Sequence, residues 1–277
     1  MYQLPSMEKA VDGLFAGSPD AAKPVETRHS FLFAIGTRSL LALLFGVISL
    51  LYATVGQAGG TAFLALMAFA AFPPSEMRPT ALALNIVAAT YSTWIFNREK
   101  IVDWGKLRPL LLSSLPTALA GGCIVLDEHV YKTTTGVVLL LAGAAMILRR
   151  QLAADCDQEA PFSSAVSVGA VVGLVSGLTG VGGGVFLAPT LIGLGWASSK
   201  QAAALSAPFI LANSAVGLIG VAFTGQLPSS HVALYAIAAL GGAIAGTMIG
   251  LKWLGQAATM SILGGILLAA GIQLVIF

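Results

Sequence analysis

A cluster of glycines inside a long apolar stretch constrains the fold more than any other feature of the chain. The cluster is Gly180-Val181-Gly182-Gly183-Gly184, within an apolar run from about residue 165 to residue 194. Each glycine costs a helix about 1 kcal/mol relative to alanine, so the cluster predicts a helix break. In hydrocarbon, unpaired backbone N–H and C=O groups cost several kcal/mol each unless protein or a water-filled cavity surrounds them. A break at membrane depth therefore predicts a functional site.

The composition supports the membrane reading of this stretch. Of 277 residues, 57% are hydrophobic and only 9% are charged, and the mean hydropathy is +0.88. A soluble domain carries about 25% charged residues, so the chain is predicted to be an integral membrane protein with the lipid bilayer as its surroundings. The net charge of +2 is too small to indicate a nucleic-acid partner. The two cysteines, Cys123 and Cys156, predict neither a disulfide nor a metal site.

A second glycine cluster, Gly56-Gln57-Ala58-Gly59-Gly60, interrupts the first long apolar stretch at about residues 39 to 72. Residues 51–65 align with residues 174–188 without a gap. The identities include Gly59 and Gly60 with Gly182 and Gly183, and Phe63-Leu64-Ala65 with Phe186-Leu187-Ala188. Three further apolar segments follow the glycine cluster in each half. The sequence thus predicts two homologous repeats, and transporters are commonly built in this way.

The predicted fold is an all-α polytopic membrane protein. Each repeat has four apolar segments, and the first segment of each is a glycine-broken helix. The expected organisation is a polar N-terminal tail at 1–38, a transmembrane repeat at 39–148, a polar linker at 149–164 and a second transmembrane repeat at 165–277.

The two repeats fit two arrangements in the membrane. The loop after the second segment carries Arg98, Lys100, Lys106 and Arg108, whereas its counterpart, residues 224–231, carries no Lys or Arg. Because Lys and Arg prefer cytoplasmic loops, this contrast favours inverted repeats, which require each broken segment to be a re-entrant hairpin. Eight full spans in a parallel arrangement would satisfy the remaining charges about equally well, so the loop contrast decides in favour of inversion.

No Asp, Glu, Lys or Arg lies near the centre of a predicted apolar span, and intramembrane ionisable groups are the usual mark of proton relays and cation coupling. The chain also lacks the HExxH, GxxxxGK[ST] and GxSxG motifs, so an enzyme is not expected. A helix that begins at a glycine cluster instead presents free N–H groups and the positive end of its dipole, to which an anion can approach closely. Two such helix starts facing each other predict an anion site built from backbone. The alternative reading is that the glycines only permit tight helix crossings.

The candidate substrate-binding residues follow from this reading. Backbone donors are expected from Gly59, Gly60, Gly182, Gly183 and Gly184. Candidate side-chain contacts are Gln57, Thr61, Thr179, Asn85 and Asn213, for which hydrogen bonding between helices is an equally good explanation. No catalytic residue, cofactor or metal site is expected.

The order of these motifs resembles the sulfite exporter TauE/SafE family, also called the toluene-sulfonate uptake permease family. The matching features are the duplicated glycine-rich broken segment, the loop ending in Ile101-Val102-Asp103-Trp104, and the run Gly180–Pro189, which fits a GxGGG pattern followed by apolar residues and proline. The resemblance covers about residue 40 to the C-terminus. The sequence departs from the pattern at Gln57-Ala58, Thr61 and Ala204-Leu205-Ser206, so the exact anion stays open.

The resemblance implies a secondary carrier of small sulfur-containing anions, such as sulfite, sulfoacetate or organosulfonates, in the cytoplasmic (inner) membrane of a prokaryote. Its expected partners are the anion and the bilayer, with a homodimer as a possible assembly. Two alternatives from the residues stay open: a carrier for another small anion, and a membrane scaffold or accessory subunit that uses its glycines only for packing.

Overall fold

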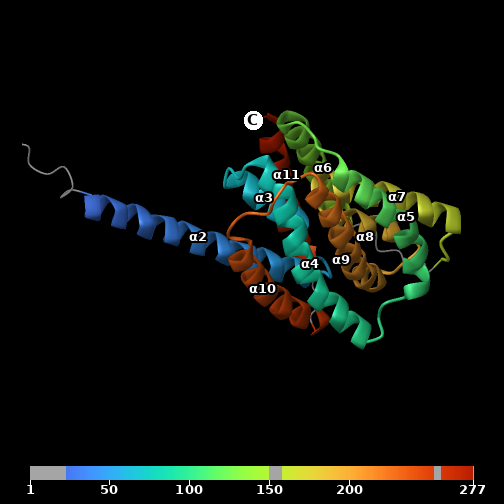
Figure 1. The fold of residues 1–277 in the computed structure, drawn as a ribbon. Helices are drawn as coiled ribbons and strands as arrows, with labels where there is room; N and C mark the ends of the chain where they lie inside the picture. The colour runs from blue at the N-terminus through green and yellow to red at the C-terminus, as the bar shows by residue number, and fades with distance from the viewer. Residues whose placement is uncertain (1–22, 150–157, 253–256, 277) are drawn as a thin grey trace, which may run out of the picture. The chain divides into compact units, whose positions relative to one another are not determined.

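All regular structure is helical in the residues that the structure describes. The computed structural model describes residues 23–149, 158–252 and 257–276 (Figure 1). The helices are α2 (Lys23–Ala53), α3 (Gly60–Phe69), α4 (Pro74–Arg98), α5 (Trp104–Cys123), α6 (Glu128–Arg149), α7 (Phe162–Thr179), α8 (Gly184–Gly193), α9 (Ser199–Phe223), α10 (Val232–Lys252) and α11 (Ala257–Ile276). The all-α prediction is confirmed for these ranges.

The chain divides into two compact units, Met1–Leu41 and Ala42–Phe277. In the first unit, the described residues form the N-terminal part of α2, which begins at Lys23. The helix therefore starts well before the position near residue 39 at which the polar tail was predicted to end. The rest of that tail and half of the predicted linker, residues 150–157, lie outside the described residues. All features below belong to the second unit.

Several helix starts are explained by local sequence. Asp103 caps α5, because its Oδ1 accepts hydrogen bonds from the backbone N–H of Gly105 at 2.9 Å and of Lys106 at 3.2 Å. Ser198 and Gln201 form a reciprocal capping box at the start of α9. Helix α4 begins with Pro74 in its first turn. Proline is tolerated there because N–H groups of the first turn have no acceptor within the helix. These side-chain caps fix where the loops end.

The element lengths recur in the two halves of the chain. The short helices α3 and α8 have 10 residues each, and the following helices α4 and α9 have 25 residues each. The packing is reciprocal as well: α3 contacts α11 and α8 contacts α6, while α4 contacts α10 and α9 contacts α5. A contact between a helix of the first half and one of the second thus recurs between their counterparts, as a two-fold relation between the halves would produce.

Corresponding helices run antiparallel where they meet. On the α4–α9 pair, Phe96 near the end of α4 packs with Ala204 near the start of α9, whereas Leu82 near the start of α4 approaches Gly217 near the end of α9. The α6–α11 pair is also antiparallel, because Gly136 lies against Gly271 and Gly143 lies against Gly264. In both of these pairs, a helix of one half runs opposite to its partner from the other half.

Two rows of glycine hold neighbouring helices at close range. Gly169, Gly173 and Gly177 place α7 against carbonyl oxygens of α5. Gly242, Gly246 and Gly250 place α10 against carbonyl oxygens of α2 and of Thr54, the residue after it. A Cβ at any of the six would overlap the facing backbone. Glycine at every fourth position is a familiar way of bringing membrane helices together. These glycines are explained by packing alone.

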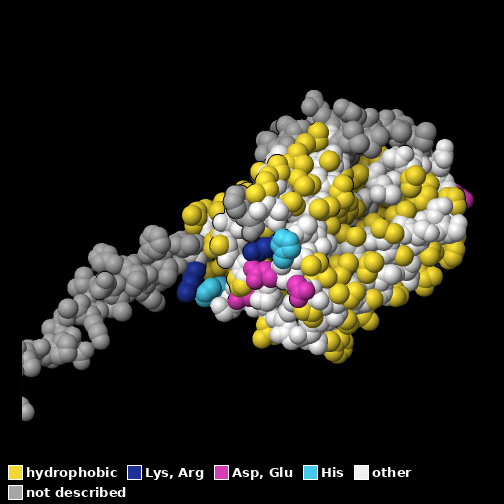
Figure 2. All heavy atoms as spheres, turned by 90° about the horizontal axis from the view of Figure 1, so that it is seen from above, with side chains coloured by type: hydrophobic (Ala, Val, Ile, Leu, Met, Phe, Trp, Pro, Cys, Tyr) yellow, Lys and Arg dark blue, Asp and Glu magenta, His cyan; other side chains and the backbone are white. Residues whose placement is uncertain are grey.

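The surface carries many apolar side chains. Leu112, Val171 and Ile237 are 65%, 64% and 72% exposed, and Figure 2 shows hydrophobic atoms spread over the visible face with few charged side chains among them. Within the described residues, three helical stretches are long and apolar enough to span a membrane: Phe162–Thr179, Lys200–Phe223 and Val232–Gly250. The exposed apolar surface is that of a chain surrounded by lipid rather than water.

Candidate functional site

In the first glycine-broken segment, α3 folds back along α2. The Tyr52 hydroxyl and the Thr61 hydroxyl are hydrogen-bonded at 2.9 Å. Further along α3, the Phe63 ring packs edge-on against Phe45, an earlier residue of α2, with ring centroids 5.6 Å apart. Because later residues of α3 meet earlier residues of α2, the segment is a hairpin whose tip is the glycine break.

The second broken segment is also a hairpin. Helix α7 ends at Thr179, the break follows, and α8 begins at Gly184. Beyond the end of α8, the Gly195 carbonyl accepts a hydrogen bond of 2.8 Å from the backbone N–H of Gln158, which precedes α7. Both ends of the segment therefore lie at the same end of α7, and the break lies between them at the tip.

Glycine is required at the start of both short helices. Gly59 and Gly183 are the N-cap residues of α3 and α8, with φ of 101° and 79° respectively. This left-handed region is accessible to glycine and strained for residues with a Cβ. Because the cap residue is glycine, neither helix start has a side-chain cap.

The backbone donors at these two helix starts are buried and unused. Among the residues that the structure describes, the N–H groups of residues 58–62 and 181–185 donate no hydrogen bond, and all of these residues are buried. The first N–H groups of any helix lack an intrahelical partner, but on a surface water satisfies them. Burial without a partner costs about 1–3 kcal/mol per group. Two uncapped helix starts therefore present donors to whatever occupies the space beside them.

The two breaks meet at Asn85 of α4. Gly60 lies so close to the Val181 carbonyl and to the Asn85 amide that it has no room for a Cβ. On the other break, a methyl group at Gly182 would lie 2.8 Å from Asn85 Nδ2. The same Nδ2 donates a hydrogen bond of 3.3 Å to the Gly180 carbonyl. Asn85 is fully buried, and its Oδ1 has no hydrogen-bond partner among the described residues.

The other predicted side chains divide into two groups. Thr61 and Thr179 are buried beside the breaks, but Thr61 is bonded to Tyr52 and the Thr179 hydroxyl donates to the Val175 carbonyl at 2.8 Å. Asn213 donates to the Phe209 carbonyl one turn earlier in α9, and its buried Oδ1 is unpartnered among the described residues. Gln57 is 3% exposed within the first break. Asn85 is thus the predicted side chain that touches both breaks.

The junction of the breaks is asymmetric. Asn85 is the twelfth residue of α4 and faces Gly60, the first residue of α3. The twelfth residue of α9 is Ile210, and it faces Gly184, the first residue of α8. One helix start is therefore covered by an amide and the other by an alkyl side chain.

Two residues outside the predicted set also lie at the second break. Ser214 has a fully buried hydroxyl with no partner in the described part of the chain, and it would lie 3.1 Å from a methyl group at Gly182. Arg78 is 1% exposed, and its Cα would lie 3.2 Å from a Cβ at Gly180. Its guanidinium donates to the carbonyls of Gly121, Gly122 and Ile124, where α5 ends. An arginine just after Pro73-Pro74, at the edge of an apolar span, was the available sequence signal for it.

No group of three or more His, Cys, Asp or Glu side chains that would suit a metal ion occurs among the described residues. The chemistry that the geometry offers is instead that of backbone N–H groups, one buried amide and one buried hydroxyl. Such donors recognise an oxyanion, which accepts hydrogen bonds at several oxygens.

Comparisons with known proteins agree with the membrane character of the fold. Residues 40–274 match the family described as Sulfite exporter TauE/SafE. The chain is 35% identical over 238 residues to "Probable membrane transporter protein y4hK" of Sinorhizobium fredii (strain NBRC 101917 / NGR234), covering 84% of this chain and 96% of that protein. No solved structure matches. This multi-pass membrane protein therefore belongs to the sulfite exporter TauE/SafE family of membrane transporters.

Proposed function

We propose that the chain is a secondary transporter of small sulfur-containing anions, such as sulfite or organosulfonates, and that the anion binds where the two glycine breaks meet. The observation that carries the proposal is the contact of two uncapped, buried helix starts around Asn85. Each helix start offers unpaired N–H groups as donors, and the helix dipole places about half a positive charge at the same position. The site attracts an anion with partial charges only, so the bound anion can also be released.

The proposed position is near the middle of the membrane. Helices α3 and α8 have 10 residues each, about 15 Å at 1.5 Å per residue, or about half of a hydrocarbon core of ~30 Å. Two half-length helices that return to the side from which their segment entered place their N-termini near the midplane. Many transporters hold their substrates at such interrupted helices.

The two halves are proposed to be inverted repeats. The antiparallel α4–α9 and α6–α11 pairs support this, because corresponding helices meet in opposite directions. An axis that relates antiparallel spans runs in the plane of the membrane rather than along its normal. Inverted repeats give a carrier two related conformations, each open to one side, which is the usual basis of alternating access.

Transport in proteoliposomes tests the proposal directly. The purified wild type is expected to give saturable flux of labelled sulfite, with competition from the sulfur oxyanions that it also binds; sulfate, thiosulfate and sulfoacetate are the competitors to compare. Binding is expected to raise the melting temperature, because a ligand at 100 times its Kd stabilises the folded state by about 2.7 kcal/mol.

A non-transporting scaffold is the second candidate. It is favoured by the two glycine rows on α7 and α10, which serve packing alone. It predicts neither flux nor a ligand-dependent melting temperature for any of these anions. The break glycines argue against it, because Gly59 and Gly183 start helices in left-handed geometry rather than bringing two helix faces together.

A further inference from the structure

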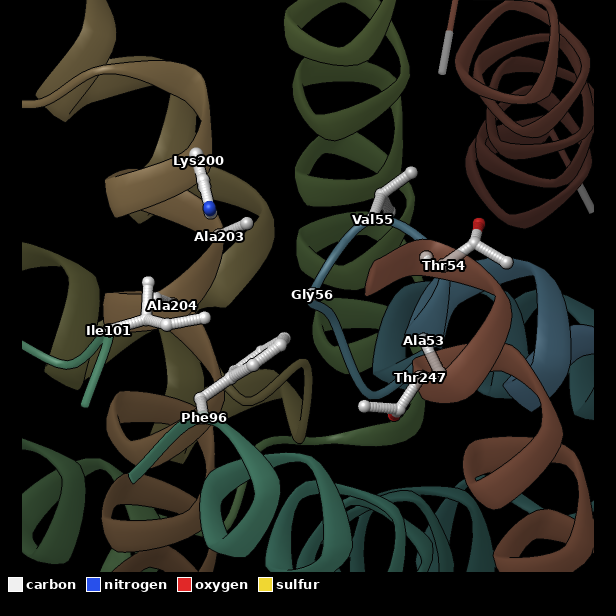
Figure 3. Close-up of a pocket in the computed structure, with 11 residues that line it drawn as sticks. Ala53, Thr54, Val55, Gly56, Phe96, Ile101, Lys200, Ala203, Ala204 and Thr247 are labelled. Atoms are coloured by element: carbon white, nitrogen blue, oxygen red, sulfur yellow. The ribbon is translucent and has the colours of Figure 1, made fainter. Parts of the chain in front are cut away.

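A small pocket of about 40 Å³ lies beside the first break and is lined by one cationic side chain, Lys200. Figure 3 shows the Lys200 side chain among its lining residues, with Phe96 and Gly56 on the other walls. The wall at the break is made where Gly56, the left-handed residue that follows α2, packs against Ala203. Lys200 is exposed, and its ammonium forms no ion pair or hydrogen bond within the described residues. We refer to this space as the Lys200 pocket.

A second pocket, of about 210 Å³, lies beside the second break. Its lining includes Arg78, Tyr131, Ser75 and Gln226. Gly180, the left-handed residue that follows α7, packs against the backbone of Arg78, and the Tyr131 hydroxyl donates to the Thr179 carbonyl at 3.1 Å. We refer to this space as the Arg78 pocket.

The two pockets occupy corresponding places in the two halves. Gly56 and Gly180 each follow the helix that leads into a break. Each packs against the fifth residue of the long helix of the other half: Ala203 in α9 and Arg78 in α4. The second residues of those helices, Lys200 and Ser75, also line corresponding walls. Two independent features, the glycine contact and the lining, thus identify the pockets as a related pair.

The pockets lie at opposite ends of the central α4–α9 pair. The Lys200 pocket takes Phe96 from the end of α4 and Lys200 from the start of α9. The Arg78 pocket takes Ser75 from the start of α4 and Gln226 from just beyond the end of α9. Because α4 has 25 residues, about 37 Å at 1.5 Å per residue, the pockets are separated by roughly the thickness of a membrane.

Each pocket is lined by a cationic side chain, Lys200 in one and Arg78 in the other. Within the described part of the chain, no carboxylate pairs with the Arg78 guanidinium, which donates to three backbone carbonyls, and its buried Nε has no partner there. The carboxylate in that pocket, Glu128, is paired with Lys132 at 3.0 Å. A positive charge at a partly dehydrated opening attracts anions and raises their local concentration.

We propose that the Lys200 pocket and the Arg78 pocket are the two entrances to the anion site, one on each side of the membrane, and that Lys200 and Arg78 attract the anion there. This inference rests on the proposed transport function and adds the two routes by which the anion reaches the breaks. The anion passes Gly56 when it arrives by one entrance and Gly180 when it arrives by the other.

Cysteine labelling tests the sidedness of the entrances. Thr54→Cys lines the Lys200 pocket and Ser75→Cys lines the Arg78 pocket; each is made with Cys123→Ser and Cys156→Ser. A membrane-impermeant maleimide is expected to modify one of them only from the inside of sealed vesicles and the other only from the outside. Sulfoacetate, which does not react with the reagent, is expected to slow both modifications. Modification of both from the same side would overturn the inference.

Kinetics test the role of Lys200. Lys200→Gln is expected to raise the KM for sulfite at least threefold at low ionic strength with little change in kcat, because an attracting charge acts on arrival. Arg108→Gln is the matched control, since Arg108 is an exposed cation at the same end of the bundle and lines neither pocket. Equal effects of the two changes would overturn the role of Lys200. Failure of wild-type flux for every anion would instead overturn the proposed function, and the labelling would still report on the pockets.

Discussion

At the scale of single residues, Asn85 is the position that couples the two breaks. It touches Gly60 at the start of α3, donates to the Gly180 carbonyl, and lies within van der Waals range of Gly182. Its polarity was visible in the sequence, since an amide inside an apolar helix requires partners. Its position between the breaks was not, because hydrogen bonding to a neighbouring helix explained it equally well.

Arg78 is the residue that the sequence alone did not identify. It lies at the edge of an apolar span, where arginine usually extends to the membrane surface. The structure instead buries it against the end of α5, where its guanidinium donates to three carbonyls. The carbonyls that receive it belong to another helix, so no pattern local to Arg78 could have predicted the contact.

Arg78→Met is expected to destabilise the fold. Removal of the guanidinium leaves the last carbonyls of α5 without donors in a buried environment, and charge-assisted hydrogen bonds contribute about 1.5–3 kcal/mol each. We expect the free energy of unfolding to fall by about 3 kcal/mol, measured by denaturant unfolding in detergent. Arg108→Met, at an exposed position, is expected to change it by less than about 0.5 kcal/mol. Equal stability of the two variants would contradict the account of Arg78.

At the scale of elements, the sequence predicted both breaks, and the structure places both between a long helix and a short one. The ungapped alignment pairs Gly59 with Gly182, but the structure gives the N-cap role to Gly59 and Gly183. The alignment is one residue out because it is dominated by Phe-Leu-Ala, a side-chain match, whereas the break is defined by backbone dihedral angles. Gly56 and Gly180 correspond in the same shifted register.

This geometry also decides which substitutions test the site. Leucine at Gly183 would be forced to a φ of 79°, and its Cβ would lie 2.9 Å from Val172 and 3.0 Å from Phe209. Loss of transport in Gly183→Leu would therefore report misfolding as well as loss of the site. A substitution of equal size at Asn85 separates the two effects.

The glycine rows predict a stability difference between two glycine-to-alanine changes. Gly173→Ala inserts a methyl group against the backbone of Ser114 in α5, whereas Gly241→Ala in α10 meets nothing within 4 Å. Overpacking of this kind costs about 1–3 kcal/mol, and alanine in an open helical position is favoured by up to about 1 kcal/mol. Melting temperatures in detergent are expected to fall for Gly173→Ala and to stay level or rise for Gly241→Ala. A fall of similar size in both would count against close packing of α5 and α7.

At the scale of the whole molecule, membrane character and helical class follow from composition, and the recurring glycine breaks indicated a repeat. The total number of Lys and Arg residues satisfied was similar for both arrangements, so the sequence-based prediction of inverted repeats rested on the contrast between two loops. The antiparallel α4–α9 and α6–α11 pairs show the relative direction of helices from the two halves, which loop charge does not report. They favour inversion and thereby alternating access.

The central claim is that an anion binds between the two breaks at Asn85, and labelled sulfite flux through Asn85→Asp proteoliposomes tests it most directly. The carboxyl group has the shape of the amide but no Nδ2 donor, and any negative charge on it repels the cargo, so flux is expected to fall at least tenfold, equivalent to about 1.4 kcal/mol. Asn97→Asp is the matched control on the same helix, exposed and able to keep its hydrogen bond from Trp104. It is expected to transport within twofold of the wild type. Undiminished flux in a folded Asn85→Asp protein would contradict the account.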